Sequence, residues 1–496
     1  MKVFDNSKLL RTTKDFIRST ITGGSFIAGE FKTIAVPLNV YEVETGALVG
    51  VVENSSPEVI KAAVDAAQAS LQSTWVPWKR QESLYEAASM LDDIQEQVAS
   101  LIATEGIKTI TEARQEVERA IHTLKLSASS IDSHIGESLN LQTSYRGEGR
   151  TGYFERQPLG IVGAITPFND PLNLVAHKIG PALAAGNAVV LKPAEQTPFS
   201  ALLLVSLLHD AGVPPGRVGV LPGNAKTGQS LVADRRVDVI TFTGGQSAGT
   251  QVSSESAGRK VLLELGGNNA VVVAGDCRLH EAARACVRGA FSAAGQNCLS
   301  VQRVYVQEEV IDRFTFKAVE IAQQMSVDTK FNEASDMGPL VNREKVATLK
   351  NQIDNATADG AVVEFGGTSD GPFFAPTIMT SVNEDSDLFC SEVFGPVLLI
   401  VPYSDSDTLP RRINEAGQPM QVGIFASDIQ LCMRLANEVQ AGTVLINESS
   451  DFRSDSMPFG SFGRSGIGRE GIKYAMQELS APKSIIFTSS FANHAY

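Results

Sequence analysis

The chain has 496 residues, of which 43% are hydrophobic and 20% are charged. A chain of this length and composition can bury a large core and is expected to divide into about two or three domains, which excludes a disordered protein. The formal net charge of -14 disfavours nucleic acid and anionic membrane surfaces as main partners and favours a small-molecule ligand.

Neither export nor membrane insertion is expected. The N-terminal stretch MKVFDNSKLLRTTKDFIRST is polar and lacks the apolar core of a signal peptide. No apolar run approaches the roughly 20 residues that span a bilayer. We therefore expect a soluble protein that stays in the cytoplasm.

The cysteines indicate a reducing compartment. There are five of them, and they are far apart, with no C-x-x-C spacing. Structural disulfides are therefore not expected, and reducing conditions would keep a catalytic thiol available. The six histidines form no H-x-x-x-H pair, so we expect no metal centre. The five cysteines are Cys277, Cys286, Cys298, Cys390 and Cys432.

Residues 57–130 have the pattern of consecutive helices. Ser56 can cap the first helix, and Pro57 suits its first position. Apolar residues from Val59 to Ala67 recur on one face of that helix. The sequence therefore predicts a helical opening segment.

From about Leu159 the pattern changes to short apolar runs separated by small-residue or amphipathic helical stretches. The runs are GIVGAI, NAVVLK, VGVLPG, VDVITFTG and KVLLEL. Continuous apolar runs of this length are typical of parallel strands covered on both faces. They predict a doubly wound α/β domain, in which ligands bind beyond the carboxyl ends of the strands.

A second α/β series begins near Ala270 with AVVVAGD, followed by a helix through Phe291, the strand RVYVQEEV and a helix at 311–325. We expect it to form a second domain that faces the first across a cleft. Residues 136–157 alternate polar and apolar side chains, which predicts a projecting hairpin, and residues 483–491 predict another strand. Because exposed strands need partners at their edges, we expect a homo-oligomer.

Cys298, in FSAAGQNCLSVQR, is a candidate nucleophile. A free cysteine is more often an inert core residue. Here Gly295 removes bulk before the thiol, and an irregular turn after a helix would expose it, as a nucleophile requires. No histidine stands out as its base, which leaves that role to a glutamate.

Glu264, in VLLELGGNN, is the candidate base. A buried strand ends at this carboxylate, and Gly266 and Gly267 let a ligand approach the backbone closely. Without the cysteine, a strand-terminal glutamate beside a tight turn is an equally good interpretation. Asn169 follows the strand GIVGAIT; an asparagine there usually belongs to the turn, but its amide can also donate to a developing oxyanion.

Two further segments have features of a dinucleotide site. The strand NAVVLK delivers Lys192 and Glu195 to a loop, where a glutamate can accept from ribose hydroxyls and repel a 2′-phosphate, which favours NAD over NADP. The alternative is a surface loop with a charge pair. In TFTGGQSAGT, Gly244, Gly245 and Gly249 follow a strand and open a helix, so a pyrophosphate could meet the helix N-terminus. Their spacing is not the usual G-x-G-x-x-G.

Together these segments resemble the aldehyde dehydrogenase superfamily from about residue 25 to the C-terminus. The motifs occur in the family's order: TPFN, LKPAEQTP, FTGGQSAG, ELGGN, GQNC, EVFGP and MPFGSFGRSGIGRE. The resemblance implies a doubly wound parallel-sheet cofactor domain, an α/β catalytic domain and a small oligomerisation hairpin, assembled as a homodimer or homotetramer. The implied ranges are 1–135 and 158–263 for the NAD-binding domain, 264–475 for the catalytic domain, and 136–157 and 483–496 for oligomerisation.

The same resemblance implies a reaction. Cys298 would attack the aldehyde, and Asn169 with the Cys298 backbone N–H would hold the oxyanion. Hydride would pass to the nicotinamide, and Glu264 would activate the water that hydrolyses the thioester to the acid. The implied cofactor contacts are Lys192, Glu195 and Glu392 at the ribose hydroxyls, Phe394 beside the nicotinamide ribose, and Ile165, Thr166, Pro167, Phe168, Gly244, Gly245, Gly249 and Leu265.

Two details resemble the branch that contains lactaldehyde, phosphonoacetaldehyde and sulfolactaldehyde dehydrogenases. Asn268 stands where many relatives have lysine, and Arg303 follows in LSVQR. This branch implies a small, polar or anionic aldehyde. Arg114, in TEARQEVERA, would meet an anionic group, although such an arginine is more often solvated. Asp170 and Asn297 would also line the pocket, and a negative Asp170 there would count against a strongly anionic substrate.

Two alternative functions remain open at this point. An acylating enzyme would pass the acyl group to coenzyme A and would not need Glu264 as a base. A binding or structural protein could keep the fold without catalysis. The joint presence of Cys298, Asn169 and Glu264 favours hydrolytic aldehyde oxidation.

Overall fold

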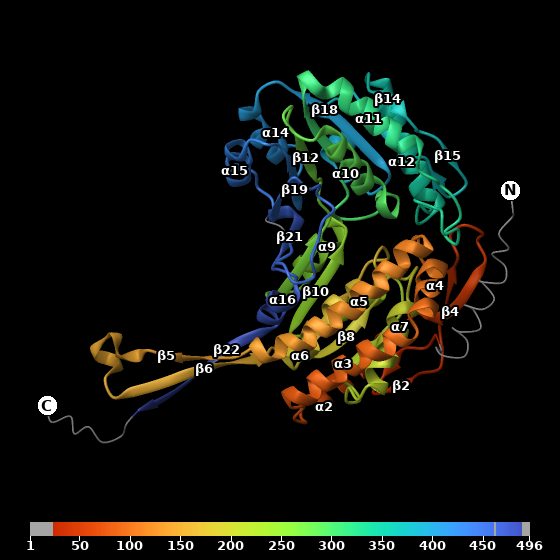
Figure 1. The fold of residues 1–496 in the computed structure, drawn as a ribbon. Coiled ribbons are helices and arrows are strands. Elements are labelled where there is room, and N and C mark those ends of the chain that lie inside the picture. The colour runs from red at the N-terminus through yellow and green to blue at the C-terminus, as the bar shows by residue number, and fades with distance from the viewer. Residues whose placement is uncertain (1–22, 461–462, 489–496) are drawn as a thin grey trace.

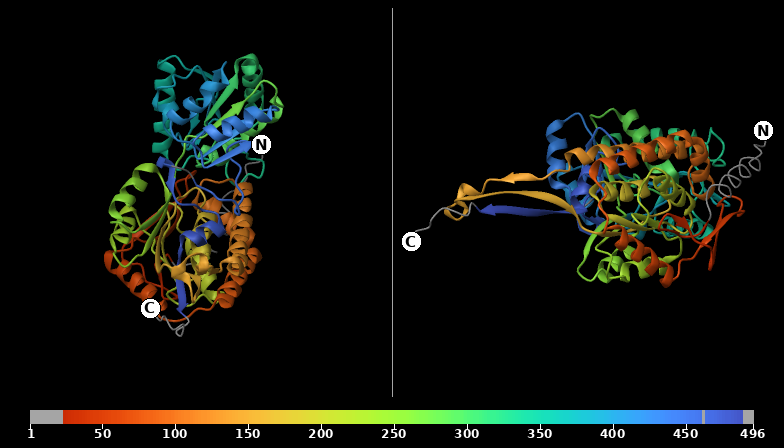
Figure 2. Two further views of the ribbon diagram at one scale, coloured as in Figure 1. Left: turned by 90° about the vertical axis from the view of Figure 1, so that its left-hand side faces the viewer. Right: turned by 90° about the horizontal axis from the view of Figure 1, so that it is seen from below.

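The structure is a computed structural model that describes residues 23–460 and 463–488. Two mainly parallel sheets and their helices form the body, and an antiparallel sheet projects from it as a long arm (Figure 1). Figure 2 shows the arm extending well beyond the body in a second direction of view. The expectations for residues 1–22 and 489–496 lie outside the described residues.

The predicted helical opening is confirmed. Ser56 caps the first helix by accepting the Val59 N–H at 3.5 Å, and Pro57 occupies its first turn. The helices are α2 (Pro57–Ser70), α3 (Pro77–Asp93), α4 (Gln95–Glu105) and α5 (Ile110–Ser130). Before them lie two short hairpins, β1 (Phe26–Ile27) with β2 (Glu30–Phe31) and β3 (Pro37–Tyr41) with β4 (Leu48–Glu53).

The predicted parallel strands form the centre of the first body sheet, in the order β9-β8-β7-β10-β11. Along β8, Val189 and Leu191 join one core while Ala188 and Val190 join another, so both faces are covered, as the apolar runs predict. The strands are β7 (Ile161–Ile165), β8 (Ala188–Lys192), β9 (Val218–Val220), β10 (Val239–Gly244) and β11 (Lys260–Leu265).

The strand order of this sheet reverses between β7 and β10. From β7 the chain moves outward through β8 and β9, and then returns to the other side of β7 for β10 and β11. Open α/β sheets bind ligands beyond the carboxyl ends of the strands at such a switch point. The connecting helices are α6 (Asn173–Ala185), α7 (Phe199–Asp210), α8 (Ala225–Ala233) and α9 (Gln246–Glu255).

The second α/β series forms a separate sheet with its own core, as predicted. Its order is β14-β17-β18-β13-β12-β19-β20, and only the pair β14 and β17 is antiparallel. The strands are β12 (Ala270–Val273), β13 (Arg303–Gln307), β14 (Val362–Phe365), β17 (Thr377–Thr380), β18 (Val397–Tyr403), β19 (Gln421–Phe425) and β20 (Thr443–Ile446). The helices are α10 (Leu279–Phe291), α11 (Ile311–Gln323), α12 (Arg343–Ala358), α13 (Asp387–Cys390), α14 (Leu409–Glu415) and α15 (Ile429–Glu438), and a small hairpin joins β15 (Ser369–Asp370) to β16 (Phe373–Phe374).

The projecting arm combines the predicted hairpin with the predicted C-terminal strand. β6 lies between β5 and β22, and it pairs with β22 from Pro158 opposite Ser480 to Arg150 opposite Thr488. The hairpin and the strand are therefore confirmed. The bounds are β5 (Glu137–Leu139), β6 (Arg150–Pro158) and β22 (Ser480–Thr488).

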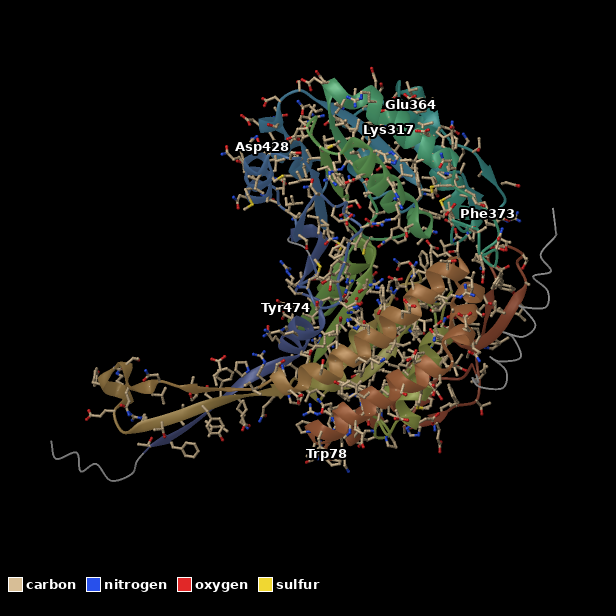
Figure 3. The ribbon with its side chains drawn as sticks, viewed as in Figure 1. Trp78, Lys317, Glu364, Phe373, Asp428 and Tyr474 are labelled. Carbon is tan, nitrogen blue, oxygen red and sulfur yellow. The ribbon has the colours of Figure 1, made fainter. Side chains whose placement is uncertain are left out.

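Before it enters the arm, the chain returns to the first sheet. β21 (Gly466–Ile467) pairs antiparallel with β11, and α16 (Ile472–Glu478) packs on α6. Tyr474 of α16 lies near the point where the arm leaves the body (Figure 3). The domain boundary expected at residue 475 therefore falls inside α16, which packs with the first sheet and its helices. The sequence of residues 466–478 has no change in composition that would mark where the chain returns to that sheet.

Candidate active site

Cys298 lies on an irregular loop between α10 and β13. The loop begins with a left-handed turn, Ser292–Gly295, in which the three residues from Ala293 onward have φ angles of 50°, 53° and 67°. A Cβ atom at Gly295 would lie 2.2 Å from the backbone oxygen of Gly395, so glycine is required there. The predicted irregular turn is confirmed, and the half-buried Cys298 faces a cavity.

This cavity has a volume of about 390 Å³ and lies beyond the carboxyl ends of β7, β10 and β11. Residues of the second sheet unit and of the loop before β21 close its other side. It is the place that the strand order of the first sheet favours for a ligand. The sequence-predicted residues that line it are Ile165, Thr166, Pro167, Phe168, Asn169, Gly244, Gly245, Glu264, Leu265, Cys298, Glu392 and Phe394.

Three predicted cofactor residues do not line this cavity. Lys192 ends β8, and burial lowers the pKa of its ammonium group to about 8. Glu195 follows in the next loop and interacts electrostatically with Lys192. Gly249 packs α9 against β11, because a Cβ there would lie 2.3 Å from the Leu265 side chain. The structure thus places Gly249 at a helix–strand contact.

Two buried carboxylates at the cavity have opposite protonation tendencies. Burial, together with the neighbouring Glu470, raises the pKa of Glu264 well above its usual range. Burial also acts to raise the pKa of Glu470, but its ion pairs with Lys178 and Arg453, each at 3.1 Å, outweigh that effect and lower it. Glu470 is therefore the fixed anion of the pair, and Glu264 is the carboxylate that holds a proton more readily.

Asn169 and Cys298 face the same cavity from the two sheet units. The Asn169 side chain is 6% exposed, and its oxygen has no hydrogen-bond partner among the described residues. Burial raises the pKa of the Cys298 thiol to about 12; Arg453 opposes this shift, and Glu392 adds to it. The thiol is therefore protonated at neutral pH in this structure, and it needs a proton acceptor to become a nucleophile.

Arg453 is a lining residue that the sequence analysis missed. Its side chain is only 7% exposed, and its guanidinium carbon lies 3.8 Å from the centre of the Phe459 ring. One nitrogen contacts Glu470 at 3.1 Å and His177 at 3.4 Å, while Nε has no hydrogen-bond partner among the described residues. Its position just before MPFG was the available signal. The other missed lining residues are Leu174, Phe242, Thr243, Met420, Phe459 and Glu470, whereas Gly266 lines the cavity where a close ligand approach was expected.

A second, smaller cavity of about 100 Å³ shares Asn169 with the first. Asp170 and Asn297, which were expected in the substrate pocket, line this smaller cavity and not the one that contains Cys298. Lys108 forms an ion pair with the Asp170 carboxylate, and Arg119 lies 3.7 Å from it. Lys108 also pairs with Glu116 at 2.8 Å, so it is shared between two carboxylates of this cavity.

Arg114 lines neither of these two cavities. Its guanidinium pairs with Glu96 and with Glu333, both at 2.9 Å, on the outside of α5. Arg119 lines the smaller cavity instead. Five residues of α-helix turn through about 500°, so the two side chains point roughly 140° apart, and the sequence alone did not fix which face is inward.

Asn268 and Arg303 also lie away from the cavity. Arg303 is fully buried, donates to the Asn268 backbone oxygen and stacks on Phe389. The Asn268 amide donates to the backbone oxygens of Phe389 and Ala416. Both side chains stabilise the core of the second sheet. They therefore indicate relationship to the branch, and they do not contact a substrate in this cavity.

Disulfides, metal-binding clusters and membrane-spanning helices were sought among the described residues. All five cysteines are free thiols. Within residues 23–460 and 463–488 there is no group of three or more His, Cys, Asp or Glu side chains arranged to hold a metal ion. In the same ranges, every helix is too short or too polar to cross a bilayer.

Comparison with known proteins decides the family. Residues 33–485 match the model described as the aldehyde dehydrogenase family. The chain belongs to the aldehyde dehydrogenase family. It is therefore an oxidoreductase that acts on aldehydes, and the resemblance carried by its separated motifs is confirmed.

The relatives agree with the branch that the motifs indicate. A 3-sulfolactaldehyde dehydrogenase of Priestia aryabhattai is 39% identical over 93% of this chain and 97% of its own length. A lactaldehyde dehydrogenase of Methanocaldococcus jannaschii is 36% identical over 87% of this chain and 93% of its own.

Solved structures of the family have the same fold. A glyceraldehyde-3-phosphate dehydrogenase of Methanocaldococcus jannaschii complexed with NADP superposes with a TM-score of 0.88 at 34% identity, covering 92% of this chain and 100% of the other. An aldehyde dehydrogenase of Bacillus cereus in complex with NAD⁺ has a TM-score of 0.91 at 29% identity, covering 96% and 98%. The predicted α/β fold class is thus confirmed.

Proposed function

We propose that this aldehyde dehydrogenase oxidises a small, polar or anionic aldehyde to its carboxylic acid through a covalent thioester on Cys298, with NAD as the hydride acceptor. The observation that carries the proposal is the convergence of Cys298, Asn169 and Glu264 on one cavity at the switch point of the first sheet. A nucleophile, an amide donor and a carboxylate with a raised pKa are the groups that acyl chemistry on an aldehyde requires.

The first half-reaction makes the thioester. The Cys298 sulfur bonds to the carbonyl carbon as its proton leaves to solvent, and the Asn169 amide with the Cys298 N–H donates to the oxyanion. The bound nicotinamide ring supplies the acceptor for the hydride that leaves this carbon. Collapse of the oxyanion then gives the thioester.

The second half-reaction releases the acid. Glu264, having lost its proton to solvent, accepts one from the attacking water, and the sulfur regains a proton as the C–S bond breaks. Burial, together with the anionic Glu470, raises the pKa of Glu264, which makes that carboxylate a stronger base than an exposed glutamate. Coenzyme A has no necessary place in this scheme.

The residues at the switch point fit a nicotinamide dinucleotide. Thr166 Oγ1, Thr243 Oγ1 and Glu392 Oε1 are buried without a hydrogen-bond partner among the described residues. A Cβ at Gly245, the N-cap of α9, would meet nothing within 4 Å, so a pyrophosphate can approach that helix N-terminus. Solved relatives hold NADP in one case and NAD⁺ in another. We favour NAD because Glu195, beyond β8, would accept from ribose hydroxyls and repel a 2′-phosphate.

The substrate class follows from Arg453. Its charge is paired with Glu470, and its unpartnered Nε is a hydrogen-bond donor in a cavity walled largely by apolar side chains. A carboxylate, sulfonate or hydroxyl a few atoms from the aldehyde would satisfy that donor. The names of the relatives, sulfolactaldehyde and lactaldehyde dehydrogenases, are of this chemical class.

We further propose that the first sheet unit binds the cofactor, the second supplies the catalytic loop, and the arm joins copies of the chain into a homodimer or homotetramer. The arm exposes Tyr145, Ile486 and Phe487 at 81%, 45% and 55%, and apolar side chains on a projecting sheet are expected to be covered. A cytoplasmic location would keep Cys298 reduced. Light scattering of the purified chain tests the assembly, and a monomer would contradict it.

The proposed reaction is tested with a panel of lactaldehyde, sulfolactaldehyde, succinic semialdehyde and neutral aldehydes of matched length, followed by NADH absorbance with and without coenzyme A. We expect turnover without coenzyme A and a preference for the anionic members. Strict dependence on coenzyme A would establish the acylating alternative, and NAD binding without any turnover would establish a non-catalytic role.

A further inference from the structure

We propose that Glu112 of α5 is a positioning residue for Cys298; this inference rests on the proposed role of that thiol as the nucleophile. Glu112 does not line the cavity that contains the thiol. Its carboxylate accepts the backbone N–H of Ala293 at 2.6 Å, where the chain enters the left-handed turn that leads to the thiol.

The turn needs support from outside. Ala293 and Ala294 are consecutive non-glycine residues in the left-handed region, with φ of 50° and 53°, where the Cβ atom crowds the backbone. Residues keep such a conformation only when the surrounding structure imposes it. Glu112 holds the Ala293 N–H, and the buried Gln296 amide donates to the Ala293 carbonyl oxygen at 3.3 Å. Both the N–H and the carbonyl oxygen of Ala293 are thus held by side-chain hydrogen bonds.

Glu112 is itself held firmly. Its second oxygen accepts the Thr109 N–H at 3.0 Å, and the Thr109 hydroxyl accepts the Glu112 N–H at 3.3 Å, which closes the capping box of α5. One carboxylate oxygen therefore caps the start of α5, and the other accepts a hydrogen bond from the loop that carries Cys298. Because the backbone N–H of residue 109 restrains the Glu112 carboxylate, the loop is attached to a rigid element.

The same helix also holds the loop that carries Asn169. Glu116 lies one turn after Glu112 on the same face of α5, and its carboxylate accepts the N–H groups of Leu172 and Asn173 at 2.8 and 3.0 Å. One helix thus supports the thiol loop and the amide loop through two neighbouring carboxylates. The Glu112 contact consequently fixes the thiol relative to the amide that would hold the oxyanion.

The test uses Glu112→Ala, with Thr109→Ala as its matched control. Both changes weaken the capping box. Thr109→Ala keeps the bond from the backbone N–H of residue 109 to the Glu112 carboxylate, and only Glu112→Ala removes the acceptor of the Ala293 N–H. Since a misplacement of about 1 Å can cost about 100-fold in rate, we expect Glu112→Ala to lower kcat by about 10-fold to 100-fold, with KM and the Kd of NAD within about threefold of wild type. Thr109→Ala should keep kcat within about threefold of wild type.

A rescue variant separates positioning from general destabilisation. Glycine adopts the left-handed conformation without steric cost, so Glu112→Ala combined with Ala293→Gly should regain at least about fivefold of the lost kcat. If the alanine variant does not fold, Glu112→Asp replaces it, because a side chain one methylene shorter keeps the charge at the helix start without spanning to Ala293.

Wild-type kcat in the Glu112 variant, an equal loss in Thr109→Ala, or no recovery in the double variant would each overturn the inference. These outcomes are distinct from a failure of the proposed function. If the wild-type protein oxidised no aldehyde, or if Cys298→Ala remained active, the proposed reaction would fail whatever the Glu112 variants did.

Discussion

Replacing Glu264 with glutamine should separate the two halves of the reaction. The amide has nearly the shape of the carboxylate, but it cannot accept a proton from water. Glu264 Oε2 has no hydrogen-bond partner among the described residues, so an amide nitrogen at that position breaks no hydrogen bond and the effect should be chemical. General-base catalysis contributes about 10²-fold to 10⁴-fold, and hydrolysis of the thioester should slow by that factor.

The slowing of thioester hydrolysis can be measured by stopped-flow absorbance of NADH. Because the thiol proton leaves to solvent, hydride transfer continues in the variant, and about one NADH per active site appears as a burst before the stall. In the wild-type enzyme the hydrolytic step should quicken as pH rises through the raised pKa of Glu264, because only the ionised carboxylate accepts a proton. The glutamine variant should lack that dependence.

Glu281→Gln is the matched control, since the Glu281 side chain is 63% exposed and pairs only weakly, at 3.3 Å, with Arg278. It should show wild-type turnover and no burst. An unchanged steady state in Glu264→Gln, or an unaltered pH dependence, would refute the assignment of Glu264 as the base.

Three further substitutions test the substrate, the cofactor and the loop. Arg453→Met should raise KM for an anionic aldehyde by about 10-fold to 100-fold, since a hydrogen bond to a charged group contributes about 1.5–3 kcal/mol. The KM for a neutral aldehyde of the same length should change little, and an equal rise for both aldehydes would contradict the role of Arg453. Glu195→Ala should shift the ratio of kcat/KM for NADP over NAD upward by about tenfold, and an unchanged ratio would remove Glu195 as the discriminating residue. Gly295→Ala should lower the free energy of unfolding by at least about 1–3 kcal/mol, because φ is 67° and the added Cβ meets the Gly395 oxygen, and a calorimetric Tm equal to that of wild type would show that the loop accommodates the methyl group.

The fold was largely predictable because its signals are local. Continuous apolar runs specify strands covered on both faces, and Ser56 with Pro57 specifies a helix start within four residues. The return of β21 to the first sheet was not predictable, because a two-residue strand has no pattern of its own and its pairing with β11 depends on distant packing.

The candidate site was predictable where each residue follows a strand or a recognisable motif. Glu264 ends β11, and Asn169 follows β7, so the parallel sheet brings both to the same edge. Arg453 and Glu470 were missed because their charges are arranged by contacts across the fold, with Lys178 on α6 among them. Arg114 was preferred to Arg119 because an amphipathic pattern does not say which charged face meets a cavity.

Mass spectrometry of the Glu264→Gln variant tests the central claim most directly. After mixing with NAD and an aldehyde and rapid acid quenching, the peptide that contains Cys298 should carry the mass of the acyl group, in step with the burst of NADH. An unmodified Cys298 peptide during that burst, or an acyl group on any other residue, would contradict a thioester mechanism centred on this thiol.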